Sequence, residues 1–450
     1  MQAAGRKIGA INPEDDNMQN QNEQPESVRG EQLLERAARV IPGGASAAGR
    51  RVFKDVIVRT QGAYVWNADG KRFIDYLLDY GPIVLGHSDP QVNAAVKQTA
   101  DTCDLNWVGA HPLEVELAEK IVSLVPSAEK VAFVTSGSDA LLHALHVARA
   151  HTGRRKMVKF HGSFVGWQDA LAKGANFDVQ PGHVPGHDDP NSGGLSRAAM
   201  EEVIVIDWND EDAVLAVFAR DGHEIAALIC EPYLFSYGCV GPAPGFLELL
   251  RRVTAQHGAL LIFDEVKTGF RLHLGGYQAI SGVTPDLSAF GKAMGNGFTV
   301  AAIAGRADLM ELLGTAVALD GTHYANPYAL AAALETIRQL EGGALRQLDA
   351  LGEQLREGLS DAARRSGAQV TITGTGSAFM INWLPKAPVT FSDAAKADFT
   401  RAEGFRLELL KAGVLMPPFV ITEARLCAQL SQADVESTVQ AAYAAFRAVV

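Results

Sequence analysis

The stretch ALLIFDEVKTGFR, residues 259–271, places an apolar run directly before two carboxylates and a series of polar and glycine residues. A short apolar run that polar residues end at once is typical of a strand buried on both faces of a parallel sheet. Helical patterns separate it from similar runs elsewhere in the chain, which predicts an α/β fold with helices on both faces of the sheet. The other runs are Val131–Val134, Met157–Phe160, Ala226–Cys230 and Leu287–Phe290.

The composition limits the possible partners. The 450 residues include 52 acidic and 40 basic side chains, which gives a formal charge of −12. Nucleic-acid binding requires clustered Lys and Arg, so this balance argues against a nucleic-acid partner. The four cysteines form no C-x-x-C pair, and no window approaches the ~20 apolar residues of a membrane span. We expect a soluble, cytoplasmic protein with no membrane partner.

Changes of pattern along the chain predict four segments. The first is polar and lacks large apolar side chains, which is typical of a disordered tail. A helix from about Glu31 to Val40 and a β meander follow, then the alternating runs and helices, and finally Ala-rich helical patterns with one strand near residues 376–382. The predicted limits are 1–30 for the tail, 31–95 for an N-terminal segment that joins the small domain, 96–334 for the large domain and 335–450 for a smaller α+β domain.

Candidate functional residues follow the apolar runs, because ligands bind beyond the carboxyl ends of parallel strands. Ser136, Gly137 and Ser138 precede a helical stretch, and a helix N-terminus suits a phosphate group. Ordinary helix capping by Ser138 or its neighbour is the alternative. Asp264 ends one run, and Lys292 follows another among small residues, where a desolvated lysine can act as an amine nucleophile.

Taken in this order, the motifs resemble the class III aminotransferases, which are pyridoxal-phosphate enzymes of fold type I. The resemblance covers roughly residues 32–448 and is greatest to the branch that contains glutamate-1-semialdehyde aminomutase and β-amino-acid aminotransferases. It implies a large domain with a mostly parallel seven-stranded sheet and a smaller α+β domain. The motifs are Ser136–Ala140, Glu231-Pro232, Asp264–Arg271, Gly291-Lys292, and Gly321-Thr322 through Asn326-Pro327.

The resemblance implies the roles of the two central side chains. Lys292 would form the Schiff base with pyridoxal 5'-phosphate and then move a proton. Asp264 would keep the pyridine nitrogen protonated. Lys267 is the competing lysine, and it replaces an apolar residue of the family pattern. We favour Lys292 as the cofactor-binding lysine because it lies directly beyond an apolar strand.

The resemblance also implies the remaining cofactor contacts and a homodimer with shared active sites. Thr322 would reach the phosphate from the neighbouring subunit, which is why a dimer is expected. Glu231 would orient groups around the cofactor, or only cap a loop. The other expected cofactor residues are Ser136, Gly137 and Ser138 at the phosphate, Phe164 stacked on the ring and Val266 beneath it.

Two residues are expected to bind substrate, and no metal site is predicted. By resemblance, Arg50 meets a substrate carboxylate, for which a planar guanidinium is suited. The alternative is that Arg50 and Arg51 are both solvated loop charges. Tyr80 lies in a segment that lines the pocket in relatives. The helix residues His143 and His146 have no acidic or cysteine partners at metal spacing.

The function implied is transfer of an amino group from an amino acid or amine, for which a β- or aryl amino acid is our hypothesis, to an oxo acid. A glutamate-1-semialdehyde-type aminomutase is the alternative, and a non-catalytic cofactor-binding regulator is a remote one. Three departures from the branch favour the transaminase. They are Ala45–Ala48, Val165 in place of histidine, and Cys427–Leu430.

Overall fold

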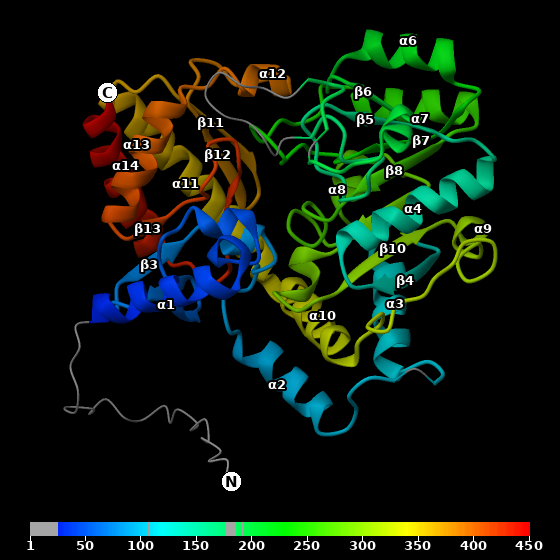
Figure 1. Cartoon of the computed structure of the whole chain (residues 1–450). Helices are drawn as coiled ribbons and strands as arrows, with labels where there is room; N and C mark the ends of the chain where they lie inside the picture. Colours follow the sequence, from blue (N-terminus) through cyan, green and yellow to red (C-terminus); the bar gives the residue numbers. More distant parts are fainter. Residues whose placement is uncertain (1–25, 107, 176–185, 191) are drawn as a thin grey trace. The chain divides into compact units, whose positions relative to one another are not determined.

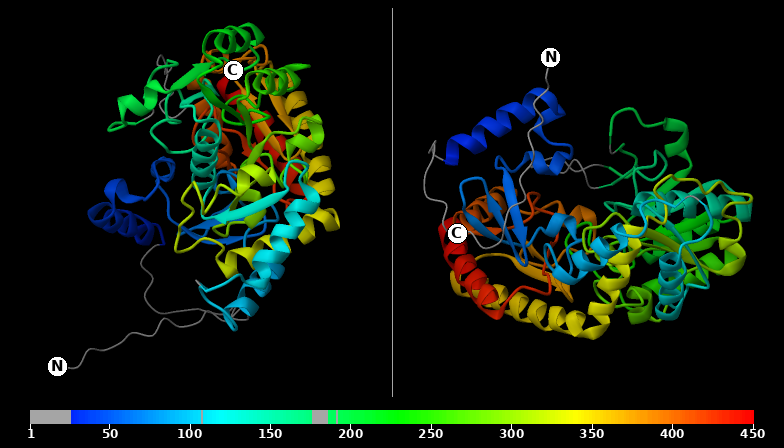
Figure 2. Two further views of the ribbon diagram at one scale, coloured as in Figure 1. Left: turned by 90° about the vertical axis from the view of Figure 1, so that its right-hand side faces the viewer. Right: turned by 90° about the horizontal axis from the view of Figure 1, so that it is seen from below.

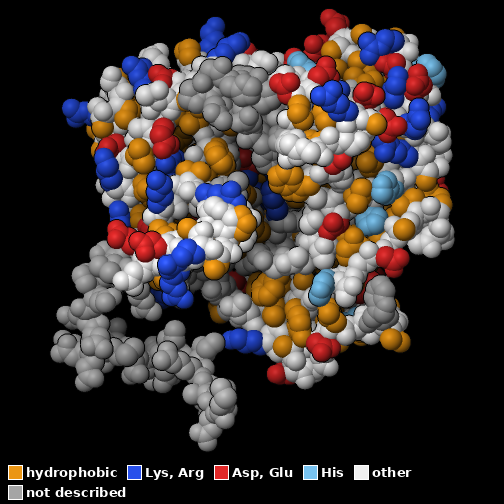
Figure 3. Space-filling view, in the orientation of Figure 1, with side chains coloured by type: hydrophobic (Ala, Val, Ile, Leu, Met, Phe, Trp, Pro, Cys, Tyr) orange, Lys and Arg blue, Asp and Glu red, His pale blue; other side chains and the backbone are white. Residues whose placement is uncertain are grey.

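The computed structural model describes residues 26–106, 108–175, 186–190 and 192–450 (Figure 1). The chain divides into two compact units, one up to Val58 together with Trp66–Lys71, the other formed by Arg59–Val65 and Arg72–Val450. No helix among the described residues is long and apolar enough to span a bilayer. On the face shown in Figure 3, basic side chains are interspersed with acidic ones.

The first unit contains α1 (Glu26–Val40), η1 (Pro42–Gly44) and η2 (Ala48–Arg51). α1 begins five residues before the expected start at Glu31, so residues 26–30 of the predicted disordered tail are helical. Residues 1–25 of the predicted tail lie outside the described residues. The helix ends as predicted at the Pro-Gly-Gly turn, where Gly43 has a φ of 67°. Arg51 donates hydrogen bonds to the carbonyls of Pro42 (2.7 Å) and Ala45 (3.2 Å).

The second unit is built on a seven-stranded sheet with the order β4-β10-β9-β8-β7-β5-β6. β10 is antiparallel to β4 and β9, and the other adjacent pairs are parallel. This confirms the predicted mostly parallel sheet, and all five apolar runs are strands of it. The strands are β4 (Lys130–Val134), β5 (Lys156–Phe160), β6 (Val203–Ile206), β7 (Ile225–Cys230), β8 (Leu260–Asp264), β9 (Leu287–Phe290) and β10 (Ala301–Gly305).

Helices cover both faces of this sheet (Figures 1 and 2). Because successive strand residues point to opposite faces, Ala227 and Ile229 of β7 belong to the core on the α4 side. Leu228 and Cys230 belong to the core on the α7 side. The helices here are α2 (Pro90–Ala100), α3 (Pro112–Leu124), α4 (Gly137–Thr152), α5 (Arg197–Glu201), α6 (Glu211–Asp221), α7 (Phe246–His257), α8 (Tyr277–Ser281), α9 (Ala307–Met310) and α10 (Pro327–Gln339).

The C-terminal part combines packed helices with a three-stranded antiparallel sheet of order β11-β12-β14. β12 is the strand predicted near residues 376–382, and a four-stranded sheet of order β1-β2-β3-β13 contains the predicted β meander. The elements are β1 (Ile57–Gln61), β2 (Tyr64–Asn67), β3 (Arg72–Asp75), α11 (Leu345–Ser366), β11 (Thr371–Thr375), β12 (Ala378–Asn382), α12 (Phe391–Ala394), α13 (Phe399–Lys411), β13 (Val414–Leu415), β14 (Ala424–Arg425) and α14 (Gln432–Val449).

The five predicted runs leave out β6 and β10 of the large sheet. β10 has the sequence Ala-Ala-Ile-Ala-Gly, and these small residues have little strand propensity of their own. β6 is only four residues long and follows a helix directly. In β10 the neighbours in the sheet, rather than local propensity, determine the structure, whereas the Val-Ile-Val-Ile sequence of β6 has high strand propensity of its own.

Candidate functional site

The carboxyl ends of β4, β7, β8 and β9 lie along one edge of the large sheet, because these strands run in the same direction. Glu231 follows β7, Asp264 ends β8 and Lys292 follows β9 as the first residue of η4 (Lys292–Gly295). α4 begins at Gly137, just beyond β4. The fold therefore brings together most of the predicted cofactor residues at the edge where parallel sheets bind ligands.

Asp264 is a buried carboxyl group that forms no ion pair with any of the described residues. Its Oδ1 accepts a hydrogen bond from the backbone N–H of Val266 (3.0 Å), and only 4% of the residue is exposed. Burial, together with the negative charge of Glu231, raises the pKa of Asp264 to about 7. A cation placed beside it would hold this carboxyl group in its charged form.

Lys292 is a partly buried amine with a strained backbone. Its φ of 44° lies in the left-handed region, which is uncommon for residues other than glycine and tends to occur at functional sites. Burial lowers the pKa of Lys292 to about 7, and the positive charges of Lys267 and Arg425 contribute to the decrease. Near neutral pH a large fraction of this lysine is therefore an uncharged, nucleophilic amine.

The start of α4 packs so closely on Val266 that its first residue has to lack a side chain. A Cβ atom at Gly137 would lie 2.6 Å from Cγ2 of Val266, so only glycine fits there. Ser136 caps the helix, its Oγ accepting a hydrogen bond from the N–H of Asp139 (3.1 Å). The remaining N–H groups of this 16-residue helix's first turn, including that of Ser138, point toward the helix start, as an anion site requires.

Phe164 lies on a loop that a buried lysine holds in place. The Lys159 ammonium group donates hydrogen bonds to the carbonyls of Ser163 (3.0 Å), Leu171 (2.8 Å) and Lys173 (2.8 Å). The backbone N–H of Phe164 donates a hydrogen bond to Oγ of Ser236 (3.1 Å). These bonds fix the backbone on both sides of the aromatic ring.

Lys267 is held by carboxylates instead of being available as a nucleophile. Its Nζ donates hydrogen bonds to Oγ of Ser236 (2.8 Å) and Oε2 of Glu231 (3.2 Å), and it lies 3.9 Å from Oε1 of Glu423. Burial alone would lower the pKa of Lys267, but the charges of Glu231 and Glu423 outweigh that effect and raise it. The protonated form is therefore favoured more strongly at Lys267 than at Lys292.

The sequence analysis missed three residues of this network. Glu423 and Arg425 form an ion pair in which both side chains are almost fully buried, and Ser236 bonds Glu231. Arg425 holds the pKa of Glu423 low against the opposing effect of burial. The sequence does contain a signal for this ion pair, because Glu423 and Arg425 are two residues apart and such residues lie on the same face of a strand.

Tyr80 and Arg50, the expected substrate residues, lie in different units of the chain. Tyr80 ends η3 (Leu78–Tyr80), and its hydroxyl group is buried with no hydrogen-bond partner among the described residues. Burial raises the pKa of Tyr80 to about 12, and the charge of Arg425 opposes the increase. Arg50 is exposed on η2, whereas Arg51 is bonded to the Pro-Gly-Gly turn, so the two arginines are not equivalent.

Thr322 lies in the loop before α10 and is exposed in this chain. Tyr324 ties the loop to α4, because its hydroxyl group forms a hydrogen bond with Nε2 of His143 (3.1 Å). Val165, one of the three departures, is fully buried in the apolar core that includes Leu141 of α4.

Comparisons with known proteins agree with this geometry. The family model described as aminotransferase class III matches residues 45–433. A glutamate-1-semialdehyde 2,1-aminomutase from Desulforudis audaxviator is 39% identical over 428 residues, which cover 93% of this chain and 98% of that protein. An omega-transaminase from Sphaerobacter thermophilus has a TM-score of 0.85 and 33% identity, covering 93% and 97% of the two chains. A β-phenylalanine aminotransferase from Variovorax paradoxus has a TM-score of 0.81 and 30% identity, covering 92% and 93%.

Proposed function

The chain belongs to the class III aminotransferases, and on that premise we propose that it is a transaminase that moves an amino group from an amino acid or amine to an oxo acid. The observation that carries the proposal is the pair formed by Lys292 and Asp264 at the ends of the adjacent strands β9 and β8. The pKa of each group lies at about 7. The lysine can therefore supply a neutral amine, and a cation beside the carboxyl group would favour its ionised form.

Pyridoxal phosphate is the cofactor, and the residues present fit it. The start of α4 offers N–H groups for a phosphate, and Asp264 offers a carboxylate for the ring nitrogen. When bound, the cofactor supplies an electron sink for the substrate carbon that loses a proton. Asp264 becomes fully ionised beside a pyridinium, because an opposite charge lowers a carboxyl pKa.

In our proposal, Lys292 and the neighbouring residues each have a separate role in binding the cofactor and moving the proton. Lys292 would hold the cofactor through its side-chain amine, and the same amine, once free, would take up and deliver the proton that leaves the substrate carbon. Phe164 and Val266 cover the two faces of the ring. Gly137 and Ser138, with Ser136 as the cap, bind the phosphate group. Glu231, fixed by Ser236 and Lys267, orients the ring surroundings.

Dimerisation completes the site in this proposal. Thr322 is exposed in this chain, so it is available to the phosphate site of a second copy. Its loop is anchored on α4 through Tyr324 and His143, which keeps the threonine in a defined place. We propose a homodimer in which each subunit contributes Thr322 to the other's site.

Arg50 and Tyr80 bind the substrate in the proposal, and the donor is a β- or aryl amino acid. A guanidinium binds both oxygens of a carboxylate, and the unpartnered hydroxyl group of Tyr80 offers a further hydrogen bond. The similarity to a β-phenylalanine aminotransferase supports this donor class.

An aminomutase acting on glutamate semialdehyde is the second candidate, which the 39% identity to the Desulforudis audaxviator protein favours. A non-catalytic cofactor-binding regulator is a remote third. The aminomutase returns the amino group to a neighbouring carbon of the same substrate and therefore needs no added oxo acid.

Absorption spectroscopy of the purified holoenzyme distinguishes the three candidates. We expect the cofactor band near ~410–430 nm to fall and a band near ~330 nm to grow when a β- or aryl amino acid is added. Pyruvate or 2-oxoglutarate should then restore the first band. Product formation from glutamate semialdehyde with no oxo acid would establish the aminomutase instead, and a spectrum that no amine changes would favour the regulator.

A further inference from the structure

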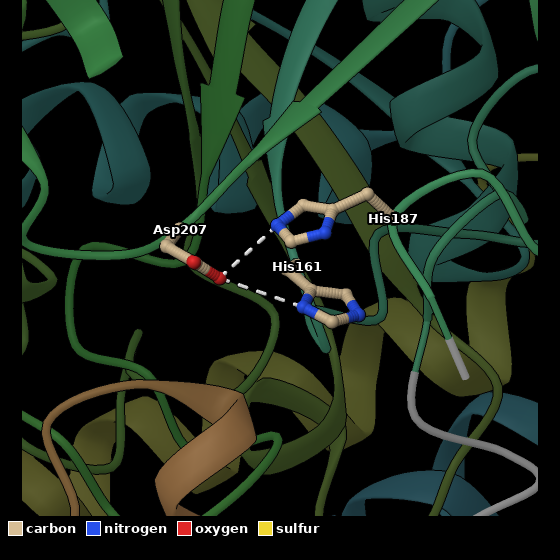
Figure 4. A group of neighbouring side chains, drawn as sticks. All are labelled: His161, His187 and Asp207. Atoms are coloured by element: carbon tan, nitrogen blue, oxygen red, sulfur yellow. Dashed lines mark hydrogen bonds and ion pairs between the residues drawn. The ribbon is translucent and has the colours of Figure 1, made fainter. Parts of the chain in front are cut away.

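Three side chains from separate segments meet beside the cofactor edge of the large sheet (Figure 4). His161 directly follows β5 and Asp207 directly follows β6, and these two strands pair in parallel. The backbone N–H of His161 donates a hydrogen bond to the carbonyl of Ile206 (2.8 Å), so the two positions are fixed to each other. His187 reaches them from the following loop.

The ligand atoms of these residues are spaced nearly as in a metal centre, but the imidazole rings of His161 and His187 are stacked with their centroids 4.1 Å apart, so one ring has to turn for both nitrogens to face one ion. Nδ1 of His161 lies 3.5 Å and Nε2 of His187 lies 3.2 Å from Oδ1 of Asp207. Two ligands bound at about 2.0–2.2 Å to one tetrahedral zinc ion lie about 3.3–3.5 Å apart. One ligand atom from each residue lies within 4.8 Å of the others, and no other such group of three occurs in the part of the chain that the structure describes.

The charges around the cluster also suit a cation. Asp207 has no Lys or Arg ion-pair partner among the described residues, and its carboxylate lies against the imidazoles of His161 and His187. The nearby Lys173 is bound to the Asp188 carboxylate (2.6 Å) and to the carbonyl of Val203 (2.9 Å). Asp207 thus offers a carboxylate that no Lys or Arg of the described residues neutralises.

Burial is graded across the cluster. His161 is 3% exposed and packs edge-on against Phe391, with ring centroids 4.8 Å apart. Asp207 and His187 are 29% and 43% exposed. His161 is therefore held by packing, while Asp207 and His187 are partly open to solvent. An ion can enter from that side, and solvent can supply its fourth ligand.

We propose that His161, His187 and Asp207 bind one divalent transition-metal ion, with Zn²⁺ as the favoured class. Two imidazoles and one carboxylate select zinc or its neighbours over Mg²⁺ and Ca²⁺, which prefer oxygen ligands. The ion would fasten the loop around His187 to the ends of β5 and β6. Because Phe164 lies three residues after His161, it would also stabilise the segment that carries the proposed cofactor-stacking ring.

Cobalt binding to the full-length holoenzyme tests the proposal, after treatment with a chelator and its removal. A tetrahedral Co²⁺ site absorbs at about 500–650 nm, beyond the cofactor bands, and its saturation reports stoichiometry. We expect one Co²⁺ per chain, displaced by Zn²⁺, and loss of the signal in His187→Ala and in Asp207→Asn. His223→Ala is the matched control, since His223 is 77% exposed and pairs with a single carboxylate, Glu224 (3.6 Å).

Thermal unfolding with added Zn²⁺ provides a second readout that does not depend on transaminase activity. An ion that binds the folded protein should raise the melting temperature of the wild type and of His223→Ala, but not of His187→Ala. Absence of binding to the wild type, or equal binding by His187→Ala and Asp207→Asn, would overturn the proposal. Neither result would affect the transaminase assignment, because Lys292 and Asp264 lie outside the cluster.

Discussion

The turn after β8 and the turn after β9 each enclose a lysine, yet the two environments shift the lysine pKa in opposite directions. Lys267, after β8, contacts Glu231 and Glu423, and its pKa is raised. Lys292, after β9, is buried and lies near other positive charges, and both effects lower its pKa to about 7. Burial alone therefore does not make a lysine nucleophilic, because nearby carboxylates stabilise the protonated form of its amine.

Lys292→Ala should have the largest effect. It removes the amine that we propose both holds the cofactor and moves the proton, so kcat should fall by about 10²–10⁴-fold or more. Steady-state assays of amino transfer measure the loss. Lys267→Ala serves as the comparison, and an equal or greater loss of kcat in that variant would reverse the two assignments.

Asp264→Asn should have the next largest effect, with kcat reduced by about 10²-fold or more because the ring nitrogen loses its charged partner. The variant should also change the stability of cofactor-free protein. The folded pKa of Asp264, about 7, exceeds the ordinary 3.8, so the wild type loses stability as pH rises between those values. Denaturant unfolding at several pH values should show a smaller loss in the variant.

Lys267→Met should alter stability and pH dependence more than maximal turnover. Glu231 and Glu423 would lose their shared partner, which costs about 3–5 kcal/mol of unfolding free energy. Removing a positive neighbour should raise the Lys292 pKa, so the rising limb of kcat/KM should move to higher pH. Lys396→Met is the control, since Lys396 is 69% exposed. An unshifted pH profile would mean that Lys267 does not act on Lys292.

Tyr80→Phe should have the smallest effect. The hydroxyl group has no protein partner among the described residues, so its removal should change stability by less than about 0.5 kcal/mol. If it binds substrate, KM should rise by about two- to tenfold with kcat nearly constant. Urea unfolding and steady-state kinetics check the two parts, and an unchanged KM for every donor would exclude Tyr80 from the substrate site.

The sequence predicts what depends on local patterns. Apolar runs identified five strands of the large sheet, and the residues after them located Asp264 and Lys292 at its edge. Ala-rich β10 was missed because its strand character comes from pairing with β4 and β9.

Contacts between distant segments were beyond sequence reasoning. Glu423 lies more than a hundred residues after Lys267, and nothing local indicates that these two side chains meet. The cluster of His161, His187 and Asp207 likewise depends on the pairing of β5 with β6. Arg51 illustrates a finer limit, since only the structure shows that it, unlike Arg50, bonds the preceding turn.

The most direct test of the central claim is to locate the lysine that carries the cofactor. Borohydride reduction of the holoenzyme, followed by proteolysis and mass spectrometry, fixes the cofactor to its lysine and identifies the labelled peptide. We predict the label on Lys292, with Lys267 unlabelled because carboxylates hold it protonated. Label on Lys267, or label that persists in Lys292→Ala, would contradict the account.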